Sequence, residues 1–248
     1  MAENLIYIHL EDVSHLVASY GITHLDFVNS LTKMPAHLLL LTPVDEEQMV
    51  DSHTGFNVIS GDHEIRSYLL NRHMRQQKWI DYRRTLYLDE VTPNEIAEML
   101  YLGHMYTQLQ SPFYYKLEND FVYLDLPEGM TKVYYRHLNQ FETVFNTALL
   151  HHLRTREIEM RFWMRLRQDH LQPLSHENLV ELVPVMEEGL LLPFTDVQFK
   201  PGELQIPFFR MKKRFVVNDD DWTRSQSEML GFLVFDRHAR QWHIRWQA

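Results

Sequence analysis

Histidine is the residue type in this chain that most invites a hypothesis of metal chemistry. The sequence has 15 histidines, and the densest groups are His137, His151-His152, Asp169-His170 and His176. Zinc requires several converging ligands, often two on one helical face at positions i and i+4. The chain has no His-Glu-x-x-His segment, and the neighbours His151 and His152 point to different sides of a regular element. The spacing therefore favours ordinary surface and boundary histidines.

The common glycine and cysteine motifs are absent. No two of the eight glycines lie closer than Gly55 and Gly61, whereas a P-loop and a dinucleotide-binding turn both need clustered glycines. The Gly-x-Ser-x-Gly nucleophile elbow does not occur. Without cysteine there is no disulfide, thiolate nucleophile, iron–sulfur ligand or Cys-type zinc site. We therefore expect no metal and no small-molecule cofactor, although these absences do not exclude catalysis in general.

Two short charged runs have simple structural interpretations. Asp219-Asp220-Asp221 lacks the alternating spacing and the later Glu of a calcium loop, so an acidic turn or a cap for a helix at Trp222 is favoured. Lys212-Lys213-Arg214 lies near aromatic residues, as in a nucleic-acid platform. A short basic run is also typical of an edge strand that is guarded against aggregation, and we favour that interpretation.

The candidate partner-binding residues are Arg161, Trp163 and Arg165. Apolar and polar residues alternate from Ile158 to Leu166, which predicts a half-buried strand whose polar face carries these three side chains. Arg and Trp are favoured at protein interfaces, so this face is a candidate site for a protein partner. In the alternative interpretation, the C-terminal segment of the same chain covers the face.

The composition favours a folded protein that does not bind nucleic acid. Hydrophobic residues make up 45% of the chain and aromatic residues 12%, which is ample for a core. The formal net charge of −10 disfavours nonspecific nucleic-acid binding, because that binding needs Lys and Arg to displace counterions. No apolar run approaches the roughly 20 residues that span a bilayer, and the N-terminus lacks signal-peptide features. These features predict a cytoplasmic protein without a membrane partner.

The pattern of elements predicts an α+β fold with two small α/β-sandwich-type units and a C-terminal extension. The first unit, residues 1–80, is expected to contain an initial strand and two helices, followed by a hairpin around Gly61-Asp62. The expected strand covers 6–10, the helices cover 13–20 and 25–31, and the hairpin strands cover 55–60 and 63–70.

The second unit, residues 84–188, is expected to be ferredoxin-like, in the order β-α-β-β-α-β-α. Its first helix begins with the capping box Thr92 and Glu95, and its last helix begins at Ser175 and is kinked or ended by Pro184. The remaining expected elements are strands at 85–89, 113–117, 121–126 and 158–166 and a helix over 138–152.

The third segment, residues 190–248, differs from the rest of the chain in charge. Residues 1–189 hold 15 Lys/Arg and 27 Asp/Glu, for a charge of −12, whereas residues 190–248 hold 9 and 7, for +2. The pattern predicts mostly strands, with a final hairpin of 231–236 and 241–246. The segment is rich in aromatic residues, so we expect this β-rich extension to pack on the body.

Several segments of the first two units run collinearly with those of a known family. They are the strand at 85–89 with the acidic helix after it, the aromatic segment Phe113–Asp125, Met130-Thr131 with the helix to Leu150, the strand at 158–166, Leu174–Glu181, and, nearer the N-terminus, Glu11-Asp12-Val13 and Gly21–Asp26. Together they resemble the MecA-type adaptor proteins of the bacterial Clp protease. The chain departs from that family because it has no long acidic linker and because residues 190–248 have no counterpart.

The resemblance implies a non-catalytic adaptor. One domain would capture a client protein and the other would dock on a Clp-type AAA+ ATPase, raising the client's effective concentration there. Two alternatives remain open. An interaction module unrelated to Clp would show a closed surface with one apolar patch. An enzyme or small-ligand-binding protein without a recognisable motif would show a deep polar pocket with converging titratable groups.

Overall fold

The computed structural model describes residues 4–41, 50–71, 77–83, 85–104, 109, 112–164, 171–211 and 227–247. Its strands are β1 (Leu5–Glu11), β2 (Leu16–Tyr20), β3 (His37–Leu40), β4 (Asn57–Ser60), β5 (Lys78–Tyr82), β6 (Phe121–Asp125), β7 (Met130–Tyr135), β8 (Leu190–Pro193), β9 (Gln198–Lys200), β10 (Glu203–Met211), β11 (Ser227–Asp236) and β12 (Gln241–Trp246). Its helices are α1 (His24–Ser30), α2 (Asp62–Leu69), α3 (Pro93–His104), α4 (Asn139–Met164) and α5 (His176–Glu188), with 3₁₀ helices η1 (Thr85–Glu90), η2 (Pro127–Gly129) and η3 (Phe194–Asp196).

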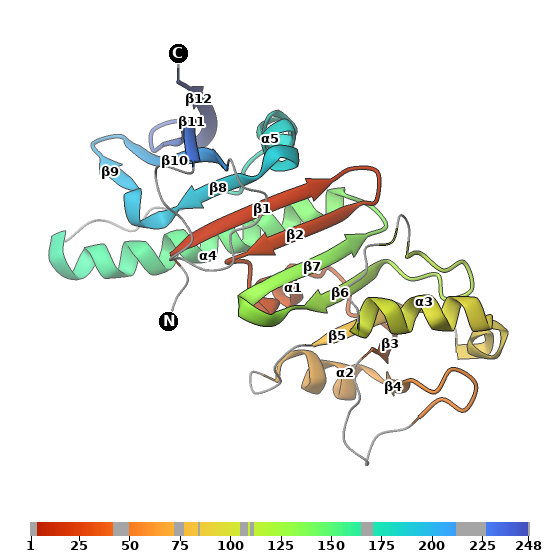
Figure 1. Ribbon diagram of the computed structural model, residues 1–248. Helices are drawn as coiled ribbons and strands as arrows, with labels where there is room; N and C mark the ends of the chain where they lie inside the picture. Colours follow the sequence, from red (N-terminus) through yellow and green to blue (C-terminus); the bar gives the residue numbers. More distant parts are fainter. Residues whose placement is uncertain are drawn as a thin grey trace.

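The described strands form one antiparallel sheet whose order does not follow the chain. The order is β12-β11-β10-β8-β1-β2-β7-β6-β5-β3-β4, and β9 pairs with β10 (Figure 1). Near the middle of the sheet, Tyr7 of β1 lies opposite Tyr20 of β2 on one side and Leu191 of β8 on the other. The beginning, middle and end of the chain therefore all contribute strands to the same sheet.

The sheet has a different helical cover on each face. Phe27 of α1, Phe145 of α4 and Leu182 of α5 are buried in the main core on one face. On the other face, Met99 and Leu102 of α3 are buried in a second core (Figure 1). No helix within the described ranges combines the length and the apolar character that crossing a bilayer requires.

The α+β class is confirmed, and several elements lie where the sequence predicts them. The strand β1, the helix α1, the hairpin of β11 and β12 and the first half of α4 match the expected ranges. The capping box of α3 is also present. The backbone N and Oγ1 of Thr92 donate to Oε2 of Glu95 at 2.6 and 2.7 Å, and the Glu95 N–H donates to Thr92 Oγ1 at 3.3 Å.

The helix predicted over 13–20 is wrong, because these residues form a turn and the strand β2. His15 adopts a left-handed conformation with φ of 52° and donates its backbone N–H to the carbonyl of Asp12. All five residues of β2 are buried. A strand that is buried on both faces shows no alternation of apolar and polar residues, so the apolar spacing imitated a helical stripe.

Two strands predicted in the next part of the chain are helical. The segment predicted as a strand over 63–70 is α2, in which Ile65, Tyr68 and Leu69 are buried at helical spacing. The segment predicted as a strand over 85–89 is the 3₁₀ helix η1. Short apolar runs of this length fit helix and strand equally well, which explains both errors.

The strand predicted over 158–166 is wrong, because α4 continues to Met164. The sequence from 153 to 164 contains no Gly or Pro, and extending an existing helix avoids the cost of starting a new element. Pro184 does not end α5, which runs on to Glu188 and is capped by Gly189 with φ of 111°. The helical turn around Pro184 is held in place by buried side chains before and after it, namely Leu182, Val185 and Met186.

The ferredoxin-like order predicted for 84–188 is not observed. The described elements of this range are η1, α3, β6, η2, β7, α4 and α5. Only two of them are strands, and these pair with β5 and β2 from the N-terminal part of the chain. Residues 190–247 then add β8 to β12 to the same sheet through the pairing of β8 with β1.

We predict that truncation after Gly189 destabilises the protein. It removes β8, which is the second neighbour of β1, and it removes core residues such as Ile206 and Phe235. The midpoint of thermal unfolding should fall by about 10 °C or more, and size-exclusion chromatography should show aggregation. A chain ending after Asp236, which loses only β12, should lose less. A truncated chain as stable and as monodisperse as the full chain would contradict the prediction.

Candidate functional site

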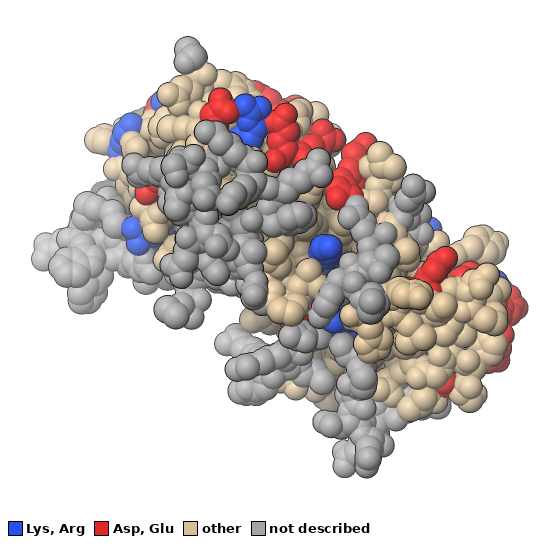
Figure 2. Space-filling view, viewed as in Figure 1, with Lys and Arg blue, Asp and Glu red and all other residues tan. Residues whose placement is uncertain are grey.

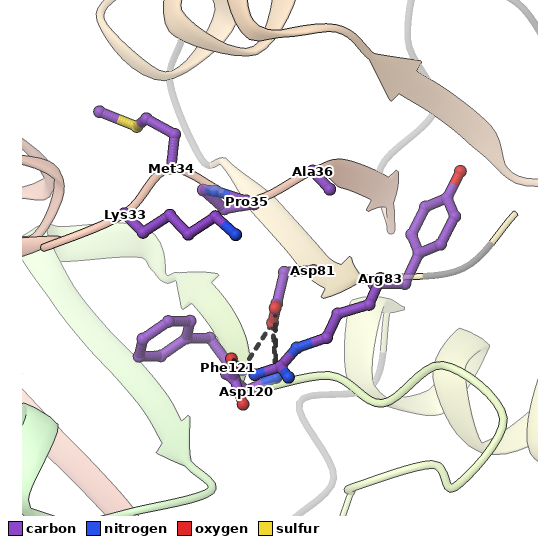
Figure 3. A pocket seen from close by; sticks show the side chains of 9 residues that line it. Lys33, Met34, Pro35, Ala36, Asp81, Arg83, Asp120 and Phe121 are labelled. Carbon is purple, nitrogen blue, oxygen red and sulfur yellow. Dashed lines mark hydrogen bonds and ion pairs between the residues drawn. The ribbon is translucent and has the colours of Figure 1, made fainter.

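Two adjoining hollows share Arg83 and Asp120 and lie at one end of the strands of the sheet. The first has a volume of about 310 Å³ and the second about 350 Å³. The first is lined by Lys33, Met34, Pro35, Ala36, Asp81, Tyr82, Arg83, Asp120 and Phe121 (Figure 3), and the second by Arg83, Tyr115, Glu118, Asp120, Arg136 and His137. We call the combined lining the Arg83–Asp120 surface.

The antiparallel topology brings these residues together. Asp81 and Arg83 lie at the end of β5, Asp120 and Phe121 at the start of β6, and Arg136 just after β7. Because neighbouring strands run in opposite directions, the end of β5, the start of β6 and the end of β7 lie side by side at the same end of the strands. The surface is therefore assembled from segments that are far apart in the sequence.

The aromatic segment before β6 is a turn and not the predicted strand of 113–117. Asn119 is fully buried, and its side chain accepts from the Tyr114 N–H at 2.9 Å and donates to the Pro112 carbonyl at 3.2 Å. The Glu118 N–H also donates to the Tyr114 carbonyl. These local bonds replace the ladder of a hairpin. They leave the side chain of Tyr115 90% exposed beside the second hollow.

Asp81 fixes the start of β6 from the floor of the first hollow. Its Oδ1 accepts from the Asp120 N–H at 3.0 Å and from the Phe121 N–H at 2.6 Å (Figure 3). The residue is only 5% exposed, and burial raises the pKa of its carboxyl to about 7. Because the carboxyl is already bound to backbone amides, its main role is to hold the turn in place.

Cationic groups flank the turn on both sides. Arg83 lies 2.6 Å from Oδ2 of Asp120, and the Nε of Arg136 lies 3.8 Å from Oδ1 of the same carboxylate. The Nε of Arg136 also donates to the Asn119 carbonyl at 2.6 Å, and its guanidinium stacks over Phe113. Lys33 extends over the first hollow from the loop before β3 (Figure 3). The surface thus presents two anchored arginines and one lysine.

The residues predicted from sequence lie elsewhere. Arg161 and Trp163 belong to the last turns of α4 and not to a strand. Arg165 lies outside the described residues. The same is true of Asp169-His170, Lys212-Lys213-Arg214 and Asp219 to Trp222. On the face drawn in Figure 2, the described Lys and Arg side chains are separated spots.

Three of the histidines singled out in the sequence make separate contacts, whereas His137 lines the second hollow. His151 Nδ1 lies 2.7 Å from a carboxylate oxygen of Asp26, and His176 Nδ1 lies 2.8 Å from one of Glu142. His152 Nε2 bonds the Gly21 carbonyl. No group of three or more His, Asp or Glu side chains within the described ranges is placed to hold a metal ion.

We predict that Asp81→Asn changes how stability depends on pH. With a folded-state pKa of about 7 against an ordinary value of 3.8, the wild-type carboxyl keeps its proton in the folded state. Its contribution to stability is therefore complete below about pH 4 and is lost as the pH rises towards 7. The asparagine amide oxygen can accept the same two N–H bonds but does not titrate.

Denaturant unfolding of both proteins from pH 4 to pH 8 measures this effect. The unfolding free energy of the wild type minus that of the variant should fall by about 1 to 4 kcal/mol over the range. Burial lowers the pKa of His24 to about 4, so the contribution of His24 to the unfolding free energy is lost as the pH falls. This contribution is the same in both proteins and cancels in the difference. A difference that is constant with pH would show that Asp81 does not titrate in this window.

Comparisons with known proteins gave no match: no protein-family model matches the chain, and no curated protein or solved structure is significantly similar to it. The function therefore has to be argued from the chain's own residues.

Proposed function

We propose that this chain is a non-catalytic adaptor that binds a client protein and delivers it to a Clp-type AAA+ ATPase in the cytoplasm. The observation that carries the proposal is the Arg83–Asp120 surface. Its two hollows adjoin, and the side chains around them include the exposed Tyr115 and Arg83 and the half-buried Arg136. Tyr and Arg are the residue types that, with Trp, dominate the binding energy of protein interfaces.

The way these side chains are held supports a binding role. Arg83 is 58% exposed, yet Asp120 anchors its guanidinium. A guanidinium has donors left over after one such bond and loses less freedom when a partner binds. Tyr115 stands on a turn that the side chains of Asn119 and Asp81 fix by accepting hydrogen bonds from backbone N–H groups. The surface is therefore preorganised for a partner.

The resemblance to the MecA-type adaptors bears on the same residues. The aromatic segment Phe113–Asp125, which is part of that resemblance, supplies Tyr115, Glu118 and Asp120 to the surface. A surface of this kind needs no catalytic group, because an adaptor works by holding two proteins near each other. The segment that suggests the family is thus also the segment that builds the candidate interface.

Recovery of partners from a lysate of the source organism tests the proposal. The tagged full chain should recover a Clp-type ATPase, and Tyr115→Ala and Arg83→Ala should each reduce recovery by about tenfold or more, as expected for central interface residues. Both side chains are well exposed, so the variants should fold normally.

The matched control is Tyr101→Ala, which removes another exposed tyrosine, on α3 and outside both hollows. It should recover as much ATPase as the wild type. Failure of the wild type to recover a Clp-type ATPase, or equal recovery by Tyr115→Ala, would count against the proposal.

The first hollow favours a second candidate function, the binding of a small anion. Lys33, Arg83, Asp81 and Asp120 line this hollow. Backbone amides engage the carboxyl of Asp81 and Arg83 engages that of Asp120, so the donors left for an anion are the ammonium of Lys33 and the remaining N–H groups of Arg83. Under this alternative, millimolar inorganic phosphate at constant ionic strength raises the unfolding temperature of the wild type by several degrees but not that of Lys33→Met. The absence of any shift in the wild type rejects it.

A further inference from the structure

The two ends of the sheet differ in how their edges are finished. At one end, β4 is bridged by Val50, which pairs with Asn57. At the other end, β12 pairs only with β11 among the described strands (Figure 1). A strand at an open edge presents unpaired backbone groups that can pair with another chain.

The register shows which residues of β12 point outward. The Gln247 N–H donates to the Leu230 carbonyl at 2.7 Å, so Gln247 faces β11. Because the direction alternates along an antiparallel pair, Arg245 and His243 also face β11, and Ile244 and Trp246 direct their N–H and C=O away from it.

The contact with α5 supports this assignment. By the same alternation, the backbone N–H and C=O of Trp242 also point away from β11. The Trp242 carbonyl accepts from the side chain of Asn178 at 3.0 Å. One turn further along α5, the carboxylate of Glu181 accepts from the indole N–H of Trp246. The helix therefore borders the edge on the side of the main core, while no described backbone group pairs with the outward groups of Ile244 and Trp246.

The side chains of β12 give its two faces different chemistry. On one face, Trp242 is buried in the main core and Ile244 packs against that core. Trp246 on the same face is 45% exposed, and its ring contacts Phe208 edge-on. On the opposite face, His243 and Arg245 are exposed to solvent. An added strand would thus meet apolar surface on one face and positive charge on the other.

Charge selects the kind of segment that fits this edge. Residues 237–247, which form the last turn and β12, contain three arginines and two histidines and no Asp or Glu, in a chain of net charge −10. Arg245 forms an ion pair with Glu203, with 3.2 Å between Nη2 and Oε1, whereas Arg240 is exposed in the turn. An acidic extended segment complements this edge, and a second copy of the same basic strand does not.

We propose that β12 binds an extended acidic segment of a protein partner as an added strand of the sheet. The segment pairs with the N–H and C=O groups of Ile244 and Trp246. Its apolar residues lie on the side of Trp246 and its acidic residues on the side of Arg245. The inference rests on the proposed adaptor function and assigns to it a site for the client.

Fluorescence anisotropy with the full chain and defined peptides tests the inference. The probe is a labelled Glu-Val-Glu-Val-Glu-Val-Glu peptide, with Lys-Val-Lys-Val-Lys-Val-Lys as its charge-reversed control. The acidic peptide should bind at least about tenfold more tightly than the basic one. N-methylation of the valines of the acidic peptide should weaken binding about tenfold or more, because it removes the backbone donors that face β12.

A matched pair of variants tests the edge itself. Ile244→Pro removes an outward N–H that makes no bond within the sheet, so proline is tolerated there and the fold should persist. This variant should weaken binding of the acidic peptide about tenfold or more, whereas Ile244→Val keeps the donor and should bind within about twofold of the wild type. Should Ile244→Pro fail to fold, the N-methylated peptide tests the same point on the wild-type chain.

The inference is overturned by equal affinity for the two peptides, by binding that N-methylation leaves unchanged, or by the lack of binding to the wild type. These outcomes are separate from failure of the adaptor proposal. A chain that recovers a Clp-type ATPase but fails with the peptides keeps the adaptor function and loses this site. A chain that binds the acidic peptide but recovers no ATPase keeps the site and loses the proposed destination of the client.

Discussion

A buried antiparallel sheet must give each backbone N–H and C=O group a partner, and this requirement organises the protein. The strand β1 meets it with β2 on one side and β8 on the other, which ties the beginning of the chain to residues 190–193. Where the chain leaves the sheet before β6, the side chains of Asn119 and Asp81 supply the missing partners. At β12, no described strand pairs with the backbone groups that point away from β11.

The candidate surface and the open edge are two consequences of this one constraint. Satisfying the backbone before β6 with buried side chains makes a rigid turn, and a rigid turn can display Tyr115 and Arg83 in fixed positions. At β12 the outward backbone groups, which no described strand pairs, are the proposed means of binding. The two surfaces lie on separate parts of the sheet, one at β5, β6 and β7 and the other at β12.

How much of the fold could be predicted depended on how local each signal was. The capping box at Thr92 and the hairpin of β11 and β12 were predicted because their determinants lie within a few residues. The strand β2 was missed because burial on both faces hides alternation. The sheet order was beyond reach, since the pairing of β1 with β8 joins residues that no sequence pattern relates.

The site followed the same rule. Arg161, Trp163 and Arg165 were chosen because an alternating pattern predicted a strand, and the continuation of α4 removed that premise. Arg83, Asp120 and Arg136 come together only through strand pairing, so spacing in the sequence gave no sign of them. The signal nearest to the site was the aromatic segment 113–125, in which the strand predicted over 121–126 is confirmed by β6, whereas the strand predicted over 113–117 is a turn.

Hydrogen–deuterium exchange of the full chain, with and without a purified Clp-type ATPase, is the most direct measurement of the central claim. The account predicts that the ATPase slows exchange in the turn of residues 112–120 and around Arg83 and Arg136, while exchange in α3 beside Tyr101 stays the same. Unchanged exchange across 112–120 under conditions in which the ATPase binds would contradict it.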